Sequence, residues 1–237
     1  MPIGKELSLL EKKIGYSFFD IKNLQTAMTH SSYANEQKSK GLNYPSNERF
    51  EFLGDAVLEL VISEYLFVNY TDRSEGTLTK MRQTLVCEKT LAKIAAEIDL
   101  GDYINLGRGE ELTDCRRRPK VLADALEALF AALYLDSVES GVDYKPVILN
   151  LISGEIENAL VMQRGDFKTL LQQLVEKDGA SLLEYEVVLE EGPEHNKIFT
   201  VAAKVNNNVV GTGKSNSKKD AEMKAARVAL ELFGILQ

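Results

Sequence analysis

The sequence predicts an all-helical domain followed by a small α+β domain with the element order α-β-β-β-α. Three observations lead to this fold class. Apolar residues recur at helical spacing up to about residue 160, residues 161–166 are polar toward their end, and short alternating segments separated by turns follow. A three-stranded antiparallel sheet with helices on one face fits the alternating segments. We therefore expect domains at residues 1–160 and 167–237, joined by a linker at 161–166.

The individual elements follow from the same periodicities. In the first domain, helices are expected at about residues 6–15, 20–33, 46–69, 74–86, 88–99, 119–137 and 144–161. In the second domain, a helix at 166–177 precedes strands at 183–191, 198–205 and 209–215, and a helix at 217–233 closes the chain. The turn sequences GPEHNK and NNN separate the strands.

The composition is that of an ordinary globular chain. Of its 237 residues, 44% are hydrophobic and 27% are charged, which excludes the fibrous, collagenous and disordered classes. Cys87 and Cys115 lie far apart and outside any C-x-x-C pair, so neither a disulfide framework nor a thiolate metal site is expected. The most apolar stretches contain acidic residues within less than a membrane span, and the first residues lack an apolar signal core. We expect a cytoplasmic protein without membrane contact.

The charge is distributed unevenly. A net charge of −8 argues, taken alone, against a nucleic-acid partner, because contacts to phosphate supply most nucleic-acid affinity. Residues 206–227, however, carry five basic residues and two acidic ones. Basic charge is therefore concentrated in one C-terminal segment, at the start of the last predicted helix.

Two carboxylates interrupt a helix that is otherwise apolar on nearly every side. Asp124 and Glu127 lie in the segment 121–136 and share one helix face. Burial of two unpaired like charges costs several kcal/mol, so these side chains must face a cation or reach water. A narrow stripe of the helix exposed to solvent is the alternative explanation.

A second group of acids lies on the predicted helix 46–69. Glu48, Glu51 and Asp55 fall within roughly a 60° arc, and Ser46 or Asn47 can cap the helix. For Glu48, favourable placement near the positive helix end explains the residue as well as chemistry does. Gly54 costs about 1 kcal/mol relative to alanine inside a helix, which indicates close approach of a neighbouring helix. Such a pair of helices brings both acidic groups together.

Four or five converging carboxylates form a site of hard oxygen ligands. Such ligands suit Mg²⁺ or Mn²⁺ and disfavour zinc, and the chain has only two histidines. A magnesium ion held by few carboxylates completes its coordination with water and substrate phosphate, and paired ions activate water for attack on phosphorus. Phosphodiester hydrolysis is the predicted chemistry.

Several segments of the chain carry motifs that are specific to one family. The segment NERFEFLGD (47–55) resembles the signature of the ribonuclease III family, with Phe50 where leucine or methionine is commoner. Other blocks lie around this signature in the order expected of the family: THSSYANE (29–36), EGTLTKMRQTLV (75–86), LGRGEE (106–111) and KVLADALEALFAALYLD (120–136). The C-terminal segments DFKTLLQQ, GPEHNKIF and GTGKSNSKKDAEMKAA resemble a double-stranded RNA-binding domain. The resemblance covers nearly the whole chain and matches the short bacterial form of the enzyme.

The resemblance implies a homodimeric endonuclease that needs Mg²⁺, with Mn²⁺ as a substitute and no small-molecule cofactor. It cuts double-stranded RNA, ribosomal RNA precursors among them, and leaves 5′-phosphate and 3′-hydroxyl ends with short 3′ overhangs, each subunit cutting one strand. Glu51, Asp124 and Glu127 match the family's metal ligands, and Asp55 and Glu127 its catalytic acids, with Asp55 positioning metal-bound water. Accessory acidic positions of less settled role are Glu48 and Glu75. Because the family dimerises through its signature helix, Phe50 is expected either at the interface or in the core.

The basic segment also has a physical interpretation. Ser217 begins a helix whose first turn carries Lys218 and Lys219, where free backbone N–H groups and the helix dipole attract phosphate. A solvated surface is the alternative for two lysines alone. By resemblance, Gln172 and His195 enter two successive minor grooves of the RNA, as such domains read duplex shape and 2′-hydroxyls. Lys214 and Lys224 supplement the phosphate contacts.

Other polar residues leave alternatives open. His30 is expected to be a hydrogen-bonded structural residue, whereas the run Arg116 to Arg118 either meets the RNA backbone or lies in a solvated loop. Arg82 and Arg108 are further possible phosphate contacts. Two rival functions are a noncatalytic dimeric protein that binds double-stranded RNA and a helical phosphohydrolase acting on nucleotides. The second rival leaves the C-terminal domain unexplained.

Overall fold

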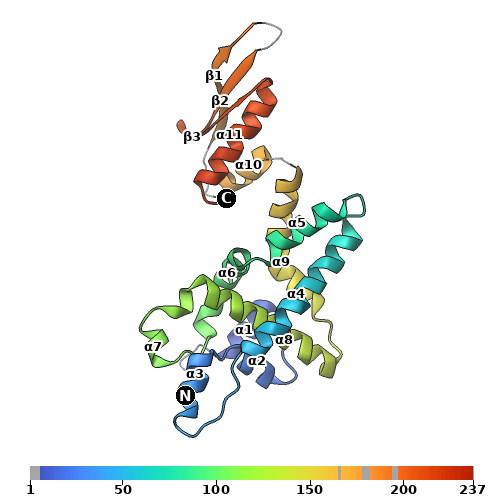
Figure 1. Cartoon of the computed structure of the whole chain (residues 1–237), viewed down its shortest axis with the longest axis vertical. Helices are drawn as coiled ribbons and strands as arrows, with labels where there is room; N and C mark the ends of the chain where they lie inside the picture. The colour runs from blue at the N-terminus through green and yellow to red at the C-terminus, as the bar shows by residue number, and fades with distance from the viewer. Residues whose placement is uncertain (1–5, 165–166, 178–181, 194–196, 237) are drawn as a thin grey trace. The chain divides into compact units, whose positions relative to one another are not determined.

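The computed structural model describes residues 6–164, 167–177, 182–193 and 197–236. The chain forms two compact units, Met1–Ile156 and Glu157–Gln237. The first is helical, and the second has the order helix, three strands, helix, so the predicted fold class is confirmed (Figure 1). None of the described helices combines the length and the apolar character needed to cross a membrane.

The helical unit contains most of the predicted elements and three short ones that the periodicity did not indicate. Its α-helices are α1 (Leu7–Ile14), α2 (Ile21–Ala27), α3 (Ser31–Lys38), α4 (Glu48–Asn69), α5 (Glu75–Val86), α6 (Glu88–Glu97), α7 (Arg108–Glu111), α8 (Pro119–Ser140) and the first part of α9 (Lys145–Arg164). The unpredicted pieces are α7 and two 3₁₀ turns, η1 (Leu100–Tyr103) and η2 (Cys115–Arg117).

The single helix expected at residues 20–33 is wrong, because the chain breaks between α2 and α3. Thr29 forms a parallel bridge with Asn105, and the backbone N–H of His30 donates to the Asn105 carbonyl at 3.1 Å. His30 then caps α3, its ring nitrogen accepting the backbone N–H of Ser32. The break therefore depends on a partner far away in the sequence, and the expected structural role of His30 is confirmed.

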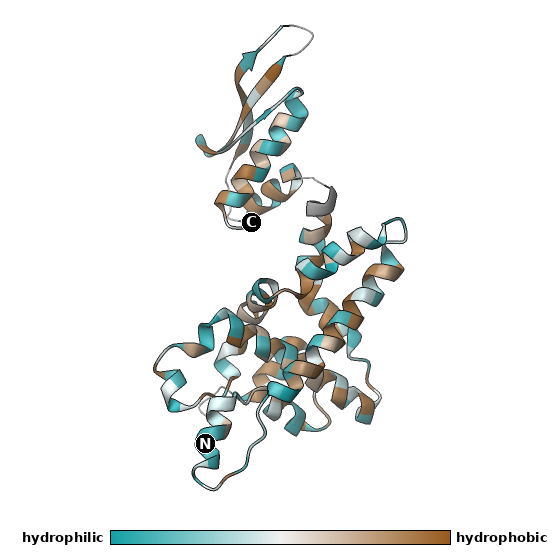
Figure 2. Cartoon of the chain, viewed as in Figure 1, coloured by the Kyte–Doolittle hydropathy of each residue, from teal (hydrophilic) through white to brown (hydrophobic). Residues whose placement is uncertain are grey.

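The core of the helical unit forms around α8. Eleven of its 22 residues are buried, as expected from its nearly uniform apolar character, and it contacts α2, α4 and α6 (Figure 2). One of the buried residues is a carboxylate, Asp136, which is fully enclosed. It accepts hydrogen bonds from the Tyr16 hydroxyl at 3.0 Å and from the backbone N–H groups of Phe19 and Asp20 at 2.9 and 2.8 Å. These donors satisfy a buried charge that would otherwise be costly.

The second unit consists of α10 (Phe167–Lys177), β1 (Leu183–Glu191), β2 (Ile198–Val205), β3 (Asn208–Ser215) and α11 (Lys218–Leu232). The strands form an antiparallel sheet in the order β1-β2-β3. The NNN turn is confirmed: Asn206 and Asn207 both have positive φ, as a two-residue hairpin turn requires. The apolar sides of α10 and α11 meet in one core together with Ala203 of β2.

Small residues let α11 lie directly on β3. A Cβ on Gly211 or Gly213 would overlap the backbone of α11, beside Ala221, Ala225 and Ala229. Those three alanines are fully buried. The GTG and A-x-x-x-A spacings are therefore explained by packing between strand and helix, and they set the position of the α11 N-terminus.

The predicted linker differs from the observed chain in one respect. Helix α9 continues to Arg164, so residues 161–164 of the expected linker are helical, whereas residues 165 and 166 lie outside the described part. The boundary between the two compact units falls earlier, between Ile156 and Glu157, within α9. The domain limits at 160 and 167 stay a prediction.

Candidate active site

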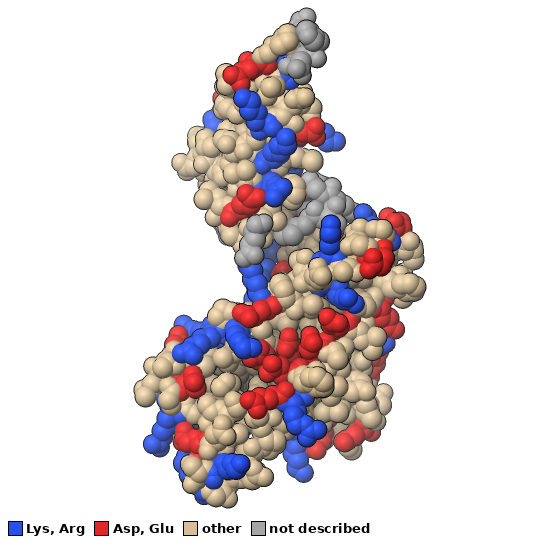
Figure 3. All heavy atoms as spheres, viewed as in Figure 1, with Lys and Arg blue, Asp and Glu red and all other residues tan. Residues whose placement is uncertain are grey.

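Helices α4 and α8 bring three of the predicted carboxylates together. One carboxylate oxygen each from Glu51, Asp124 and Glu127 lies within 4.8 Å of the others, and all three side chains are half-buried. Gly54 allows this approach, because a Cβ there would overlap the carbonyl of Glu127. The expected close helix contact is thus confirmed. In Figure 3, acidic side chains gather on the face of the helical unit where α4 and α8 lie.

The carboxylates destabilise one another's charged forms. Burial, followed by the charges of Asp55, Asp124 and Glu51, raises the pKa of Glu127 to about 7. Burial and then the charge of Asp124 also raise the pKa of Glu51. The ammonium of Lys120 lies beside the cluster, 3.2 Å from Asp124. Half-buried oxygen ligands that repel one another are suited to a hard divalent cation.

Asp55 stands apart from this group of three. Its side chain is exposed, one turn beyond Glu51 on α4, and it is not among the oxygens that meet within 4.8 Å. Its charge is nevertheless the leading electrostatic contribution to the raised pKa of Glu127. Asp55 is therefore an exposed acid whose charge acts on Glu127 from outside the group of three.

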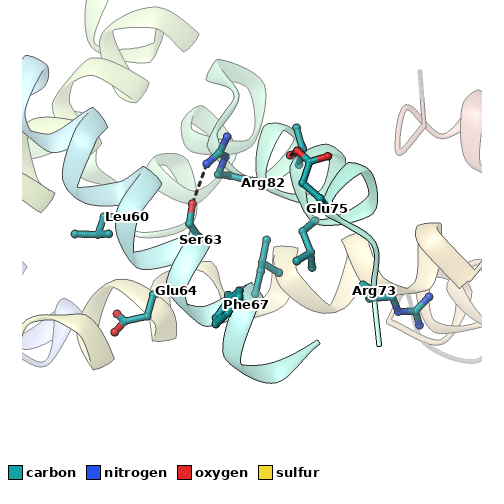
Figure 4. A pocket seen from close by; sticks show the side chains of 10 residues that line it. Leu60, Ser63, Glu64, Phe67, Arg73, Glu75 and Arg82 are labelled. Atoms are coloured by element: carbon teal, nitrogen blue, oxygen red, sulfur yellow. Dashed lines mark hydrogen bonds between the residues drawn. The ribbon is translucent and has the colours of Figure 1, made fainter. Parts of the chain in front are cut away.

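The two accessory acids lie outside the cluster. Glu48 is exposed in the first turn of α4, where it accepts a hydrogen bond from the Ser46 hydroxyl at 3.0 Å. Asn47 occupies the cap position of α4 without a capping side-chain bond, so the expected side-chain cap is wrong. Glu75 begins α5 and accepts a hydrogen bond from Thr79. It lines a separate pocket between α4 and α5 (Figure 4).

In the second unit, the predicted phosphate-binding residues lie at the start of α11. The Ser217 hydroxyl accepts the backbone N–H of Asp220 at 3.1 Å and caps the helix. Lys218 and Lys219 follow in the exposed first turn, and within the described residues Lys219 forms no ion pair. Gln172 is exposed on α10 and donates to Glu176. The remaining predicted contact, His195, lies outside the described residues.

The arginines divide into structural and exposed ones. Arg116 pairs with Glu111 and donates to the carbonyl oxygens of Gly101 and Ile104, so it ties η2 to η1 rather than lying in a solvated loop. Arg117 is 82% exposed. Arg82 donates to Ser63 at 3.0 Å and connects α5 to α4 (Figure 4).

An exposed apolar stripe on α4 was not predicted from the sequence. Phe52, Leu60 and Phe67 are 82%, 61% and 73% exposed, whereas Phe50 is half-buried. Leu60 and Phe67 also line the pocket of about 580 Å³ between α4 and α5 (Figure 4). The signal was present in the sequence, because these three residues lie within roughly an 80° arc of the helix.

A helical unit with clustered carboxylates, followed by a sheet and helices with a basic helix N-terminus, defines the class of nucleases that carry an RNA-binding domain. Comparisons with known proteins agree. Residues 20–145 match the family model "Ribonuclease-III-like", and residues 167–232 match "Double-stranded RNA binding motif".

Whole-chain relatives extend the match. Ribonuclease 3 of Clostridium tetani is 46% identical, over 95% of this chain and 94% of the relative. Ribonuclease 3 of Caldanaerobacter subterraneus subsp. tengcongensis is also 46% identical, over 98% of this chain and 100% of the relative. A solved nuclease domain of ribonuclease III from Campylobacter jejuni has a TM-score of 0.56 and 40% identity over 63% of this chain and 97% of that domain. The chain belongs to the ribonuclease III family, the metal-dependent endoribonucleases that cleave double-stranded RNA.

Proposed function

We propose that this chain cleaves double-stranded RNA with Mg²⁺ as its metal ion, and that it leaves 5′-phosphate and 3′-hydroxyl ends with short 3′ overhangs. The observation that supports this proposal is the meeting of Glu51, Asp124 and Glu127 oxygens within 4.8 Å. All three donors are carboxylates, a set that favours Mg²⁺ or Mn²⁺ over softer metals. We expect Mn²⁺ to substitute and no small-molecule cofactor to be needed.

Each acid has a proposed role. Glu51, Asp124 and Glu127 would hold the ion, which when bound supplies a Lewis acid for water activation and for charge on the leaving oxygen. Asp55 is exposed and its charge acts on Glu127, so it would accept a hydrogen bond from the attacking water and orient it. Glu48 and Glu75 lie farther out and are proposed to contact RNA or a further ion. A noncatalytic RNA-binding protein is the less favoured alternative. Clustered, half-buried carboxylates are energetically costly, and a domain that only forms a dimer does not need them.

We propose that the active form is a homodimer that uses the α4 stripe formed by Phe52, Leu60 and Phe67. Large exposed apolar side chains along one helix, beside an apolar pocket, are typical of protein interfaces. The solved Campylobacter jejuni nuclease domain has structural flexibility in a region involved in dimer formation. In the proposed dimer, each subunit cuts one strand. Phe50, expected at the interface or in the core, is half-buried, and we place Phe52 in the proposed interface.

The second unit is proposed to hold the duplex. The Ser217 cap and the lysines Lys218 and Lys219 bind phosphates across the major groove, and Gln172 contacts a minor groove. His195 stays a prediction for the second minor groove. We further propose a cytoplasmic location, with ribosomal RNA precursors among the substrates.

The test uses the purified full-length protein and a long RNA duplex at low salt, with Mg²⁺, Ca²⁺ or EDTA in parallel. We expect Mg²⁺-dependent cleavage to duplex fragments with 5′-phosphates, and no cleavage by Glu127→Gln although it still binds RNA. A duplex of DNA serves as the substrate control. Tight RNA binding without cleavage in any metal would favour the noncatalytic alternative, and turnover of mononucleotides instead of duplex would favour the nucleotide phosphohydrolase.

A further inference from the structure

The end of strand β1 places two carboxylates among the lysines of the proposed RNA-binding surface. Glu190 pairs with Lys218 at 3.0 Å and with Lys197 at 3.4 Å. Its neighbour Glu191 pairs with Lys214 at 2.7 Å. Two lysines of this surface, Lys214 and Lys218, thus contact acidic side chains of the same chain, and Lys197 shares Glu190 with Lys218.

Lys218 contacts both a carboxylate and an aromatic ring. It lies in the first turn of α11, and its ammonium also stands 5.2 Å from the centre of the Phe199 ring. The hydrogen bond from Lys218 is the largest cause of a lowered pKa at Glu190, so this carboxylate is charged at neutral pH. The anion therefore sits where the helix N-terminus and Lys218 would otherwise attract a phosphate.

Around the start of α11, acidic side chains offset part of the positive charge in the free protein. The cations are Lys197, Lys214, Lys218, Lys219 and Lys224, and the anions are Glu190, Glu191 and Asp220. Of the two first-turn lysines, only Lys219 lacks an ion pair within the described part of the chain. An RNA phosphate that approaches Lys218 must come close to the Glu190 carboxylate, and like charges at such distances repel.

We propose that Glu190 is a built-in competing anion: RNA phosphate displaces its carboxylate from Lys218, so Glu190 lowers the affinity of the protein for duplex RNA. The inference rests on the proposed RNA-binding role of Lys218. Its consequence for the enzyme is weaker retention of short duplex products, because the carboxylate returns to Lys218 as phosphate leaves. Exposed ion pairs contribute little to folding stability, so removal of Glu190 leaves the domain folded.

The experiment measures dissociation constants of the full-length protein for a duplex of about 16 base pairs, the span of one such domain. EDTA in the buffer prevents cleavage. The variants are Glu190→Gln, Lys218→Ala and the double substitution, each at several salt concentrations. The matched control is Glu186→Gln. This substitution removes the same charge from the same strand, but Glu186 pairs with Lys204 instead of Lys218.

We expect Glu190→Gln to tighten RNA binding about three- to tenfold. This corresponds to the repulsion between two unit charges about 4 Å apart in water. The gain should vanish in the Lys218→Ala background and should shrink as salt rises. An equal gain from Glu186→Gln would reduce the effect to net charge and overturn the proposal. Weaker binding by Glu190→Gln would overturn it as well, since Glu190 would then hold Lys218 in place for RNA. Failure of the unmodified protein to bind duplex RNA would instead reject the proposed function.

Discussion

Gly54 of α4 lies directly against the main chain of Glu127 in α8. A Cβ on residue 54 would overlap the Glu127 carbonyl oxygen, with both helices in their present positions. The same contact brings Glu51, one turn earlier on α4, within reach of Asp124 and Glu127. The distance between the two helix axes therefore sets the geometry of the carboxylate cluster.

Replacement of Gly54 by alanine should impair both folding and metal binding. The added methyl group forces the helices apart, and overpacking of this kind costs about 1–3 kcal/mol. We expect a lower Tm, weaker Mg²⁺ binding by calorimetry, and slower cleavage. The matched control is Gly154→Ala on α9, where a Cβ meets nothing within 4 Å and helix propensity favours alanine by about 1 kcal/mol. Unchanged Mg²⁺ affinity in Gly54→Ala would contradict the role of this contact.

The raised pKa of Glu127 predicts a specific pH dependence of the metal-free protein. In the folded chain this carboxyl titrates at about 7, above its ordinary value of 4.5. The folded state therefore holds the proton more tightly, and the stability contributed by the neutral acid is lost as pH rises from about 5 through 7. We expect the Tm in EDTA to fall over this range relative to the Tm of Glu127→Gln. Parallel pH profiles for the two proteins would show that Glu127 titrates normally.

The same shift predicts proton release when the metal binds. Mg²⁺ requires the carboxylate, so protons compete with the metal below the pKa of Glu127. We expect Mg²⁺ affinity to weaken as pH falls from 8 to 6, with up to about one proton released per site. Calorimetry in buffers of different ionisation enthalpy measures the release, and Glu127→Gln should abolish the part that depends on this group. Pure competition with Lys120 would instead leave the affinity independent of pH in this range.

Local sequence patterns predict the elements whose causes are local. The burial of α8, the close approach at Gly54 and the strand bounds follow from periodicity and turn residues. The break before α3 does not, because Thr29 takes its partner, Asn105, from a distant segment. Likewise, Asp136 shares the apolar segment of Asp124 but faces buried donors instead of the cluster. Which acid meets which environment depends on tertiary packing, and periodicity contains no such information.

Asp136 is expected to stabilise the fold and to have no role in catalysis. Its carboxylate is fully buried and accepts hydrogen bonds from Tyr16, Phe19 and Asp20. Asp136→Ala leaves these donors unsatisfied, and we expect a loss of about 3–5 kcal/mol in the free energy of unfolding. Denaturant titration measures the loss, with Glu139→Gln, exposed on the same helix, as control. A variant that folds with normal stability but no longer cleaves would point to a catalytic role instead.

Phe52 gives the sharpest test of the proposed dimer. Its ring is 82% exposed on α4, so Phe52→Ser removes apolar surface without leaving a cavity in the monomer. If α4 forms the interface, this variant should be monomeric at micromolar concentration by light scattering, and should lose double-strand cleavage because two sites no longer face one duplex. The matched control is Phe19→Ser, since Phe19 is also highly exposed, at 74%, but lies between α1 and α2. The control should remain a dimer and cleave normally. A dimeric Phe52→Ser protein, or a Phe19→Ser protein that dissociates, would move the interface away from α4.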